Sequence, residues 1–303
     1  MGLFGGYQNP GPGINPYAPK KKPFFRYWEV FWRNLGKLLY LNIIYALFHL
    51  PLLGAMIVYV STDNKLTNAV AITLLVIQFF LEGPALAGMT RVLRLIVLDK
   101  AFFMGEEFKK GFTRNLGTSF LIWVIDALVI ASVYIGFFVY PYLERETGSK
   151  LVYIPYVISI AAAVVLLFMN YYLMPLTVVT KLKKSAIFKN SFMLTALSPK
   201  QCVLSLVCIL ARLFILWFLI QLSSIAMFLL AFVPAAFIGY QVMFTHYPVI
   251  QKYVIQPYYE ETGEKNPEEE DIPQQEEERV FTDRGTSEPP VPKQKVKRGK
   301  TIS

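Results

Sequence analysis

Histidine and cysteine are scarce in this chain of 303 residues, which contains two of each. Cys202 and Cys208 are too few and too poorly spaced for a metal cluster, and their spacing within one apolar block disfavours a disulfide. The sequence also lacks a His-Glu-x-x-His, Gly-x-Ser-x-Gly, P-loop, Cys-x-x-Cys or dinucleotide-binding pattern. It therefore predicts no catalytic residue, no metal site and no cofactor, which points away from an enzyme.

Charge is scarce as well, since charged residues make up 17% of the chain and hydrophobic residues 54%, with a mean hydropathy of +0.42. The apolar residues gather in long blocks, which is typical of a membrane protein. The first block begins near Leu38 and is longer than the hydrophobic region of a signal peptide. We therefore expect the first helix to stay in the mature protein.

Six apolar blocks are long enough to cross about 30 Å of hydrocarbon as helices. The predicted spans are residues 38–60, 68–90, 116–140, 152–179, 202–220 and 222–244. A tight hairpin at Gln221–Ser224, the only polar cluster near the middle of Gln201–Thr245, separates the last two; a single helix there is the alternative. The predicted fold is an all-α, polytopic membrane helix bundle.

Lysine and arginine fall mainly on one side of these spans, with 17 on that side and three on the other. The 17 are Lys20, Lys21, Lys22, Arg26, Arg33 and Lys37 before the first span, Arg91, Arg94, Lys100, Lys109, Lys110 and Arg114 in the second connection, and Lys181, Lys183, Lys184, Lys189 and Lys200 in the fourth. Cations mark the cytoplasmic side, so we expect both termini to be cytoplasmic in a protein of the cytoplasmic membrane.

The predicted organisation has three parts: a cytoplasmic Gly/Pro/aromatic segment at 1–37, a six-helix transmembrane domain at 38–248 and a cytoplasmic tail at 249–303. From about Pro257 the tail has too little apolar surface to offset the entropy of ordering, which predicts disorder. The tail is either a merely solubilising appendage, or its basic end, Lys293–Lys300, touches anionic lipid or a partner. The cationic face should attract anionic headgroups, and no motif indicates nucleic acid.

Two cytoplasmic segments have the pattern of helices that lie in the membrane surface. In the first, Phe24, Trp28, Phe31 and Leu35 recur at helical spacing between charged residues. In the second, aromatic residues alternate with charged ones; they are Phe102, Phe103, Phe108 and Phe112. We expect both segments to anchor the cytoplasmic face, and partner docking is the alternative.

Five polar residues are predicted to share one layer near the middle of the membrane, at depths of roughly 12–16 Å from the helix ends. They are His49, Glu82, Asp126, Asn170 and Arg212. Charges at this depth should face the bundle interior, so Arg212 is the expected counter-ion of Asp126 or Glu82, and either His49 is protonated as well or one acid keeps its proton. The layer either holds the helices together or forms a substrate or ion site.

The order of features in residues 1–250 resembles the YesL or DUF624 membrane proteins of Gram-positive bacteria. The resemblance rests on an aromatic and basic entry at Phe25–Trp28 and on two motifs, whose residues are Gly83, Pro84 and Ala85, then Phe108, Lys109, Phe112 and Asn115. It implies no established biochemical activity, and a setting beside carbohydrate uptake and polysaccharide degradation. Glu82, Asp126 and Arg212 lie outside the family pattern.

Two functions follow as expectations. The first is a non-enzymatic accessory or scaffold of a carbohydrate uptake or sensing system, with a permease or membrane sensor protein as its partner. The second is a small-solute or ion transporter or channel that uses the midplane polar layer. An inverted repeat would favour transport, but the halves 38–140 and 152–244 show none that is convincing.

Overall fold

The computed structural model describes residues 22–61, 64–222, 234–264 and 266, and every regular element among them is helical. The helices of the compact unit Pro19–Gly263 are α1 (Pro23–Arg33), α2 (Leu35–Leu47), α3 (Leu50–Ser61), α4 (Lys65–Val97), α5 (Met104–Arg114), α6 (Leu116–Thr147), η1 (Lys150–Tyr153), α7 (Ile154–Val179), α8 (Lys184–Leu197), α9 (Pro199–Leu222), α11 (Pro234–Ile250), η3 (Gln251–Ile255) and α12 (Gln256–Thr262).

Four helical segments in the described part of the chain are long and apolar enough to cross a membrane: Lys65–Val97, Leu116–Thr147, Lys150–Val179 and Pro199–Leu222. The pair α2 and α3 makes a fifth if its two helices count as one bent span. The all-α membrane bundle is thus confirmed, with four or five such spans. The sixth expected span, 222–244, starts at the last residue of α9, includes residues 223–233, which lie outside the described ranges, and continues in α11.

The first expected span is bent by 51° between α2 and α3. Phe48 and His49 lie at the break, and Pro51 follows directly as the second residue of α3. Proline has no backbone N–H, so it cannot donate the helical hydrogen bond to the carbonyl of Leu47. The bend therefore lies where proline removes this backbone hydrogen bond. Helix α4, by contrast, continues as a single helix through Pro84.

The described residues within 201–245 form two helices, α9 and α11, which pack against each other and run in opposite directions. Ser205, early in α9, contacts His246, late in α11. Arg212, later in α9, contacts Phe237, which is earlier in α11, so the two helices are antiparallel. The chain reverses between Leu222 and Pro234; the expected hairpin at Gln221–Ser224 begins within α9, and Ser223 and Ser224 lie outside the described residues.

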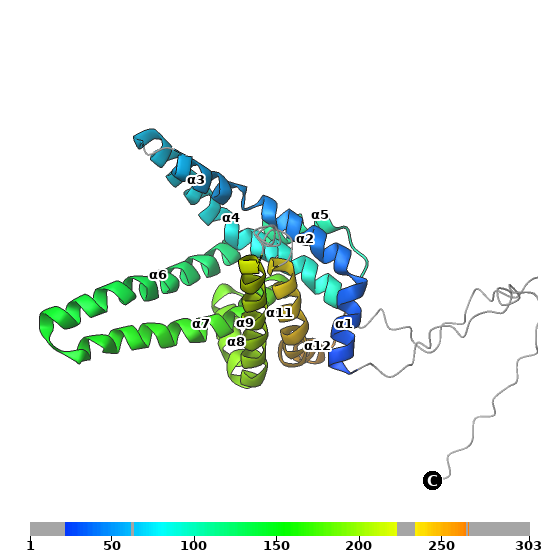
Figure 1. Ribbon diagram of the computed structural model, residues 1–303. Coiled ribbons are helices and arrows are strands. Elements are labelled where there is room, and N and C mark those ends of the chain that lie inside the picture. The colour runs from blue at the N-terminus through cyan, green and yellow to red at the C-terminus, as the bar shows by residue number, and fades with distance from the viewer. Residues whose placement is uncertain (1–21, 62–63, 223–233, 265, 267–303) are drawn as a thin grey trace, which may run out of the picture. The chain divides into compact units, whose positions relative to one another are not determined.

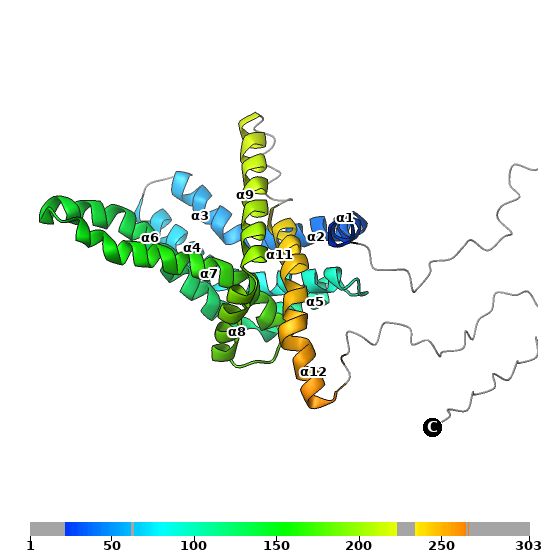
Figure 2. The same cartoon turned by 90° about the horizontal axis from the view of Figure 1, so that it is seen from below.

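The core lies where the second half of α4 meets α5, α7, α8 and α11 (Figure 1). Its largest fully buried side chains include Leu93 of α4, Tyr172 of α7 and Tyr240 of α11. Figures 1 and 2 show α6 and α7 side by side, extending away from this core. Many apolar side chains outside the core are exposed, as expected for helices that face lipid.

Cations from the three segments predicted to be cytoplasmic lie at one end of the unit. Nη2 of Arg33 is 2.5 Å from Oδ2 of Asp99, which follows α4. Nζ of Lys37 lies 5.2 Å from the ring centre of Phe102 in the second connection. Nζ of Lys184 in α8 lies 3.6 Å from the Cβ position of Gly117 at the start of α6. The sequence-based grouping of these three segments therefore has a counterpart in the fold.

Helix α1 has separate faces for the protein and for its surroundings. Tyr27 and Phe31 pack against the aromatic rings of α11, so Phe31 does not join the exposed face predicted for it. The exposed aromatic side chains are Phe24, Phe25, Trp28 and Trp32. These side chains can enter a membrane interface while the opposite face holds α1 to the core.

The prediction for the second surface segment is wrong for α5. Phe108 is buried and stacks on Phe48, and the ring of Phe112 lies 5.3 Å from that of Phe48. These aromatic side chains therefore fill the space between α5 and the α2–α3 break, although Phe103 is exposed.

The prediction of disorder from Pro257 fails for the start of the tail, because Gln256–Thr262 forms α12. Ile255 is buried and Tyr259, one helical turn later, packs against the core. This apolar pair stabilises a helix that overall composition did not predict. Residues 265 and 267–303 lie outside the described ranges.

Candidate functional site

The five polar residues predicted to share one layer belong to three separate groups in the structure. His49 and Glu82 lie together beside the α2–α3 break. Asp126 and Asn170 join α6 to α7. Arg212 bonds to α1 and α11. The prediction of one shared polar core is therefore wrong, although four of its five members were correctly expected to find a partner within the set.

The Glu82 carboxylate is the centre of the first group and accepts three hydrogen bonds or charged contacts from its neighbours. Tyr45 donates its hydroxyl to Oε1 at 2.6 Å, and the Gln78 amide donates to Oε2 at 2.7 Å. Nε2 of His49 lies 3.1 Å from Oε2. Tyr45 lies in α2 and His49 follows it by four residues at the α2–α3 break, whereas Gln78 and Glu82 lie one helical turn apart on α4.

His49 and Glu82 hold one proton between them. Nδ1 of His49 lies 3.0 Å from the backbone carbonyl of Tyr45, which only accepts, so Nδ1 carries a hydrogen. The contact of Nε2 with Oε2 then needs one more proton, placed on the imidazole or on the carboxyl group. In either form the pair is neutral overall, which reduces the free energy needed to bury it.

Arg212 does not neutralise a carboxylate of the predicted layer. Its Nη2 donates to the Tyr27 hydroxyl at 2.6 Å and its Nη1 to the carbonyl of Phe237 at 3.1 Å. No ion pair joins it to Glu82 or Asp126, all three of which are among the described residues. The expected pairing is therefore wrong, because α9 faces α1 and α11 here and not α4 or α6.

Arg212→Leu should couple energetically with Tyr27→Phe. Each change removes the same hydrogen bond. The decrease in the free energy of unfolding of the double variant should therefore be smaller than the sum of the two single decreases, by about 0.5–3 kcal/mol. Unfolding in mixed detergent measures these free energies. Arg212→Leu with Glu82→Gln is the matched control and should be additive; coupling to Glu82 in place of Tyr27 would contradict the structure.

A buried polar network surrounds His246 and was not predicted from the sequence. Its Nε2 lies 2.9 Å from Oγ of Ser205, and its Nδ1 lies 2.9 Å from the hydroxyl of Tyr172, which in turn bonds to Ser198. His246, Ser205 and Tyr172 are fully buried, so they join α7, α9 and α11 without access for a substrate. The scarcity of histidine was the one available signal.

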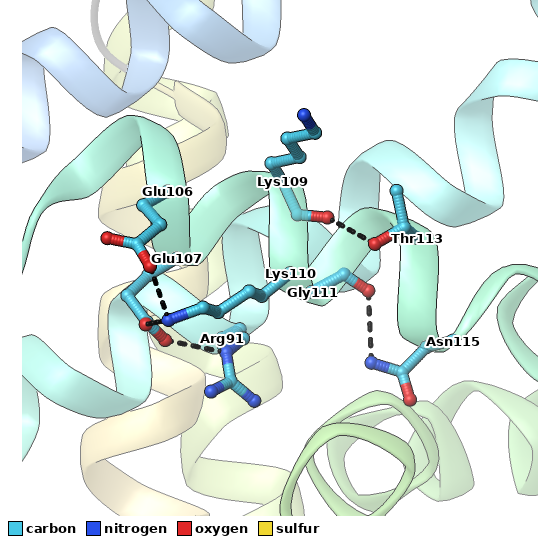
Figure 3. A network of polar contacts seen from close by, with 8 residues as sticks. All are labelled: Arg91, Glu106, Glu107, Lys109, Lys110, Gly111, Thr113 and Asn115. Carbon is cyan, nitrogen blue, oxygen red and sulfur yellow. Dashed lines mark hydrogen bonds and ion pairs between the residues drawn. The ribbon is translucent and has the colours of Figure 1, made fainter.

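A second polar network joins α4 to α5 at the cationic end (Figure 3). Glu107 accepts from Nε of Arg91 at 2.7 Å and from Nζ of Lys110 at 2.8 Å. The helices approach so closely that a Cβ on Gly111 would lie 2.9 Å from Cα of Gly88. Glycine at both positions is therefore required for this contact. The ion pair between Arg91 and Glu107 also joins the two helices.

The residues that carry the family resemblance serve mainly packing and turn formation. Gly83, Pro84 and Ala85 are buried in α4. Phe108 is buried, as described above, and the Asn115 side chain donates to the carbonyl of Gly111 at 3.0 Å where α5 gives way to α6. Among the motif side chains, that of Lys109 is the one classed as exposed.

Glu107 should make stability depend on pH. Burial alone would raise the pKa of Glu107, but the hydrogen bonds from Lys110 and Arg91 outweigh burial and hold that pKa below its ordinary value of 4.5. The stabilisation is therefore complete above pH 4.5 and is lost as pH falls through the lower, folded-state pKa. Solvent screening limits it to roughly 0.2–1 kcal/mol.

Thermal unfolding in detergent at pH 7 and below pH 4 measures this effect. Glu107→Gln should remove that part of the acid sensitivity, while Glu106→Gln, on the more exposed side of Lys110, should leave it in place. Equal acid sensitivity in the wild type and the Glu107 variant would show that the network does not contribute.

Comparison of the chain with models of protein families, with curated proteins and with solved structures gives no match.

Proposed function

We propose that this chain is a non-enzymatic, multi-pass protein of the cytoplasmic membrane that serves as an accessory or scaffold to a carbohydrate uptake or sensing system. The link to carbohydrates rests on the resemblance to the YesL or DUF624 pattern. The observation that supports the scaffold role is the tight α4–α5 junction, where exposed cations lie on closely packed helices.

The α4–α5 junction suits docking because its interior is close-packed and its exterior is charged. Phe108 and the Gly88–Gly111 contact fix α5 against α4, while Lys109 and Arg114 are exposed. Lys189 of the neighbouring α8 is exposed as well. Such a surface offers positive charge to anionic headgroups or to an acidic partner face, with little ordering required on binding.

The same end of the molecule supports the proposed orientation, with both termini in the cytoplasm. The cations of the three segments gather there, and the positive-inside rule assigns such an end to the cytoplasm. The exposed aromatic face of α1 supports this proposal, because tryptophan and phenylalanine beside cations favour the interface of an anionic leaflet.

Co-purification of the full chain from its native membranes tests the scaffold role. In mild detergent, the wild type should recover a carbohydrate permease subunit or a membrane sensor kinase. The variant Lys109→Gln, Arg114→Gln, Lys189→Gln should recover several-fold less, whereas Lys65→Gln at the start of α4 should behave as the wild type. Recovery of neither class of partner, or equal recovery by all variants, contradicts the proposal.

Transport is the second candidate function, and the His49–Glu82 pair favours it. The pair holds one proton inside a predicted span, and the nearby Oε1 of Gln78 is buried and has no hydrogen-bond partner among the described residues. Proton-coupled flux of a small solute or ion across the membrane of reconstituted vesicles should then disappear in Glu82→Gln and persist in Asp99→Asn. Absence of flux in the wild type, or flux that survives Glu82→Gln, removes this candidate.

A further inference from the structure

The α6–α7 pair is poorly covered by the other residues that the structure describes. In the most apolar 18-residue windows of these segments, 11% of residues are buried for α6 and 0% for the segment containing α7. The exposed side chains include Leu128 and Ile130 on α6 and Leu167 on α7. This surface can therefore face lipid or another membrane helix.

A carboxylate lies within this uncovered pair. Asp126 accepts from the amide of Asn170 at 2.7 Å, and both side chains are half-buried. With a rise of 1.5 Å per residue, Asp126 lies about 15 Å from the start of α6, and Asn170 about 14 Å from the end of α7. Both positions are close to the middle of a bilayer whose hydrocarbon core is about 30 Å thick.

Asp126 lacks a cation within the described part of the chain. Its hydrogen-bond partner, Asn170, is a neutral amide, and no ion pair to Asp126 occurs among the described residues. An aspartate at the centre of a lone transmembrane helix costs about 2.5–3.5 kcal/mol on insertion scales. A single amide hydrogen bond offsets only part of this, since such bonds between membrane helices average about 0.6 kcal/mol.

We propose that the α6–α7 surface around Asp126 and Asn170 binds a transmembrane helix of a partner protein that carries a lysine or arginine near its middle. The cation would pair with the Asp126 carboxylate, and its apolar neighbours would cover Ile130, one helical turn after Asp126, and Leu167, one turn before Asn170. This inference rests on the proposed scaffold role, because it specifies how the partner is held within the membrane.

A second copy of this chain is a poorer occupant than a basic helix from another protein. Among the described residues, the arginine far inside an apolar helix is Arg212, and it already donates to Tyr27 and Phe237. The other described cations cluster near the helix ends, outside the depth of Asp126. Charge complementarity therefore favours a foreign helix.

Energy transfer in reconstituted vesicles tests this binding. The full chain, labelled with a donor, is placed in phosphatidylcholine–phosphatidylglycerol vesicles with an acceptor-labelled leucine–alanine transmembrane peptide that has one central lysine. The same peptide with leucine at the centre is the control. We expect the lysine peptide to associate about tenfold more strongly, which corresponds to about 1.4 kcal/mol.

Asp126→Asn should reduce association of the lysine peptide to that of the leucine peptide, because it keeps the side-chain shape but removes the charge. Asp99→Asn, the same change outside the predicted spans, should have no effect. Asp126→Lys should instead prefer a peptide with a central aspartate, which separates charge pairing from misfolding; size-exclusion profiles of all variants check their assembly.

Equal association of the lysine and leucine peptides overturns the proposal, as does lysine-peptide binding that survives Asp126→Asn. Energy transfer between two labelled copies of the chain that depends on Asp126 also overturns it, in favour of self-association. None of these outcomes depends on native partners, so failure here is distinct from failure of the co-purification experiment.

Discussion

Gly83→Ala is expected to lower the free energy of unfolding by about 1–3 kcal/mol, although it adds one methyl group and improves helix propensity. The new Cβ would lie 2.5 Å from the carbonyl oxygen of Ser119 and 3.0 Å from Cβ of Trp123. The first obstacle is the backbone of α6, which cannot rotate away as a side chain can. The helices must therefore separate, and unfolding in mixed detergent measures the loss.

Gly36→Ala is the matched control for this substitution. A Cβ at Gly36 meets no atom within 4 Å, and the residue is also helical. The same change should therefore be neutral or stabilise the protein by up to about 1 kcal/mol through lower backbone entropy in the unfolded chain. If both variants lose the same stability, the close crossing of α4 and α6 is not what Gly83 provides.

Glu82→Leu is expected to destabilise the protein more strongly, by about 3–5 kcal/mol. The leucine leaves the hydroxyl of Tyr45, the amide of Gln78 and the imidazole of His49 without their common acceptor. Unsatisfied donors of this kind cannot turn to water in a membrane. The yield of folded protein and its resistance to denaturing detergent should both fall.

The double variant His49→Leu, Glu82→Leu is compared with Glu82→Leu alone. The comparison distinguishes the stability lost with the whole pair from the stability lost when one partner remains. Removing both charges leaves fewer unsatisfied groups, so the double variant should be no less stable than Glu82→Leu alone. A double variant whose loss equals the sum of the two single losses would show that the two side chains act independently, against the contact seen between them.

Hydropathy predicted the helices well, because the need to satisfy every backbone group in lipid leaves few alternatives. It located Glu82 and Asp126 along their helices, although His49 lies at a break that hydropathy did not predict. Position along a helix does not say which neighbour its face meets. Arg212 shows the consequence: its actual partner, Tyr27, belongs to a helix expected to face the membrane surface.

Part of the candidate site could have been found from helical spacing. Gln78 precedes Glu82 by four positions, which predicts that both lie on one face of α4. Tyr45 precedes His49 by the same spacing. The network of His246 had no such signal, because Ser205 and Tyr172 come from two other helices and have no distinctive spacing. Only the packing of α7, α9 and α11 brings these three side chains together.

The contact between α2 and α11 has a consequence for biogenesis. The buried Asn42 in α2 accepts a hydrogen bond at 2.7 Å from the backbone N–H of Ala236, near the start of α11. While the ribosome is still synthesising the middle of the chain, the donor at Ala236 has not yet been made. The protein can therefore complete this contact only after α11 has been synthesised, and chains truncated before α11 should be substrates for membrane quality control.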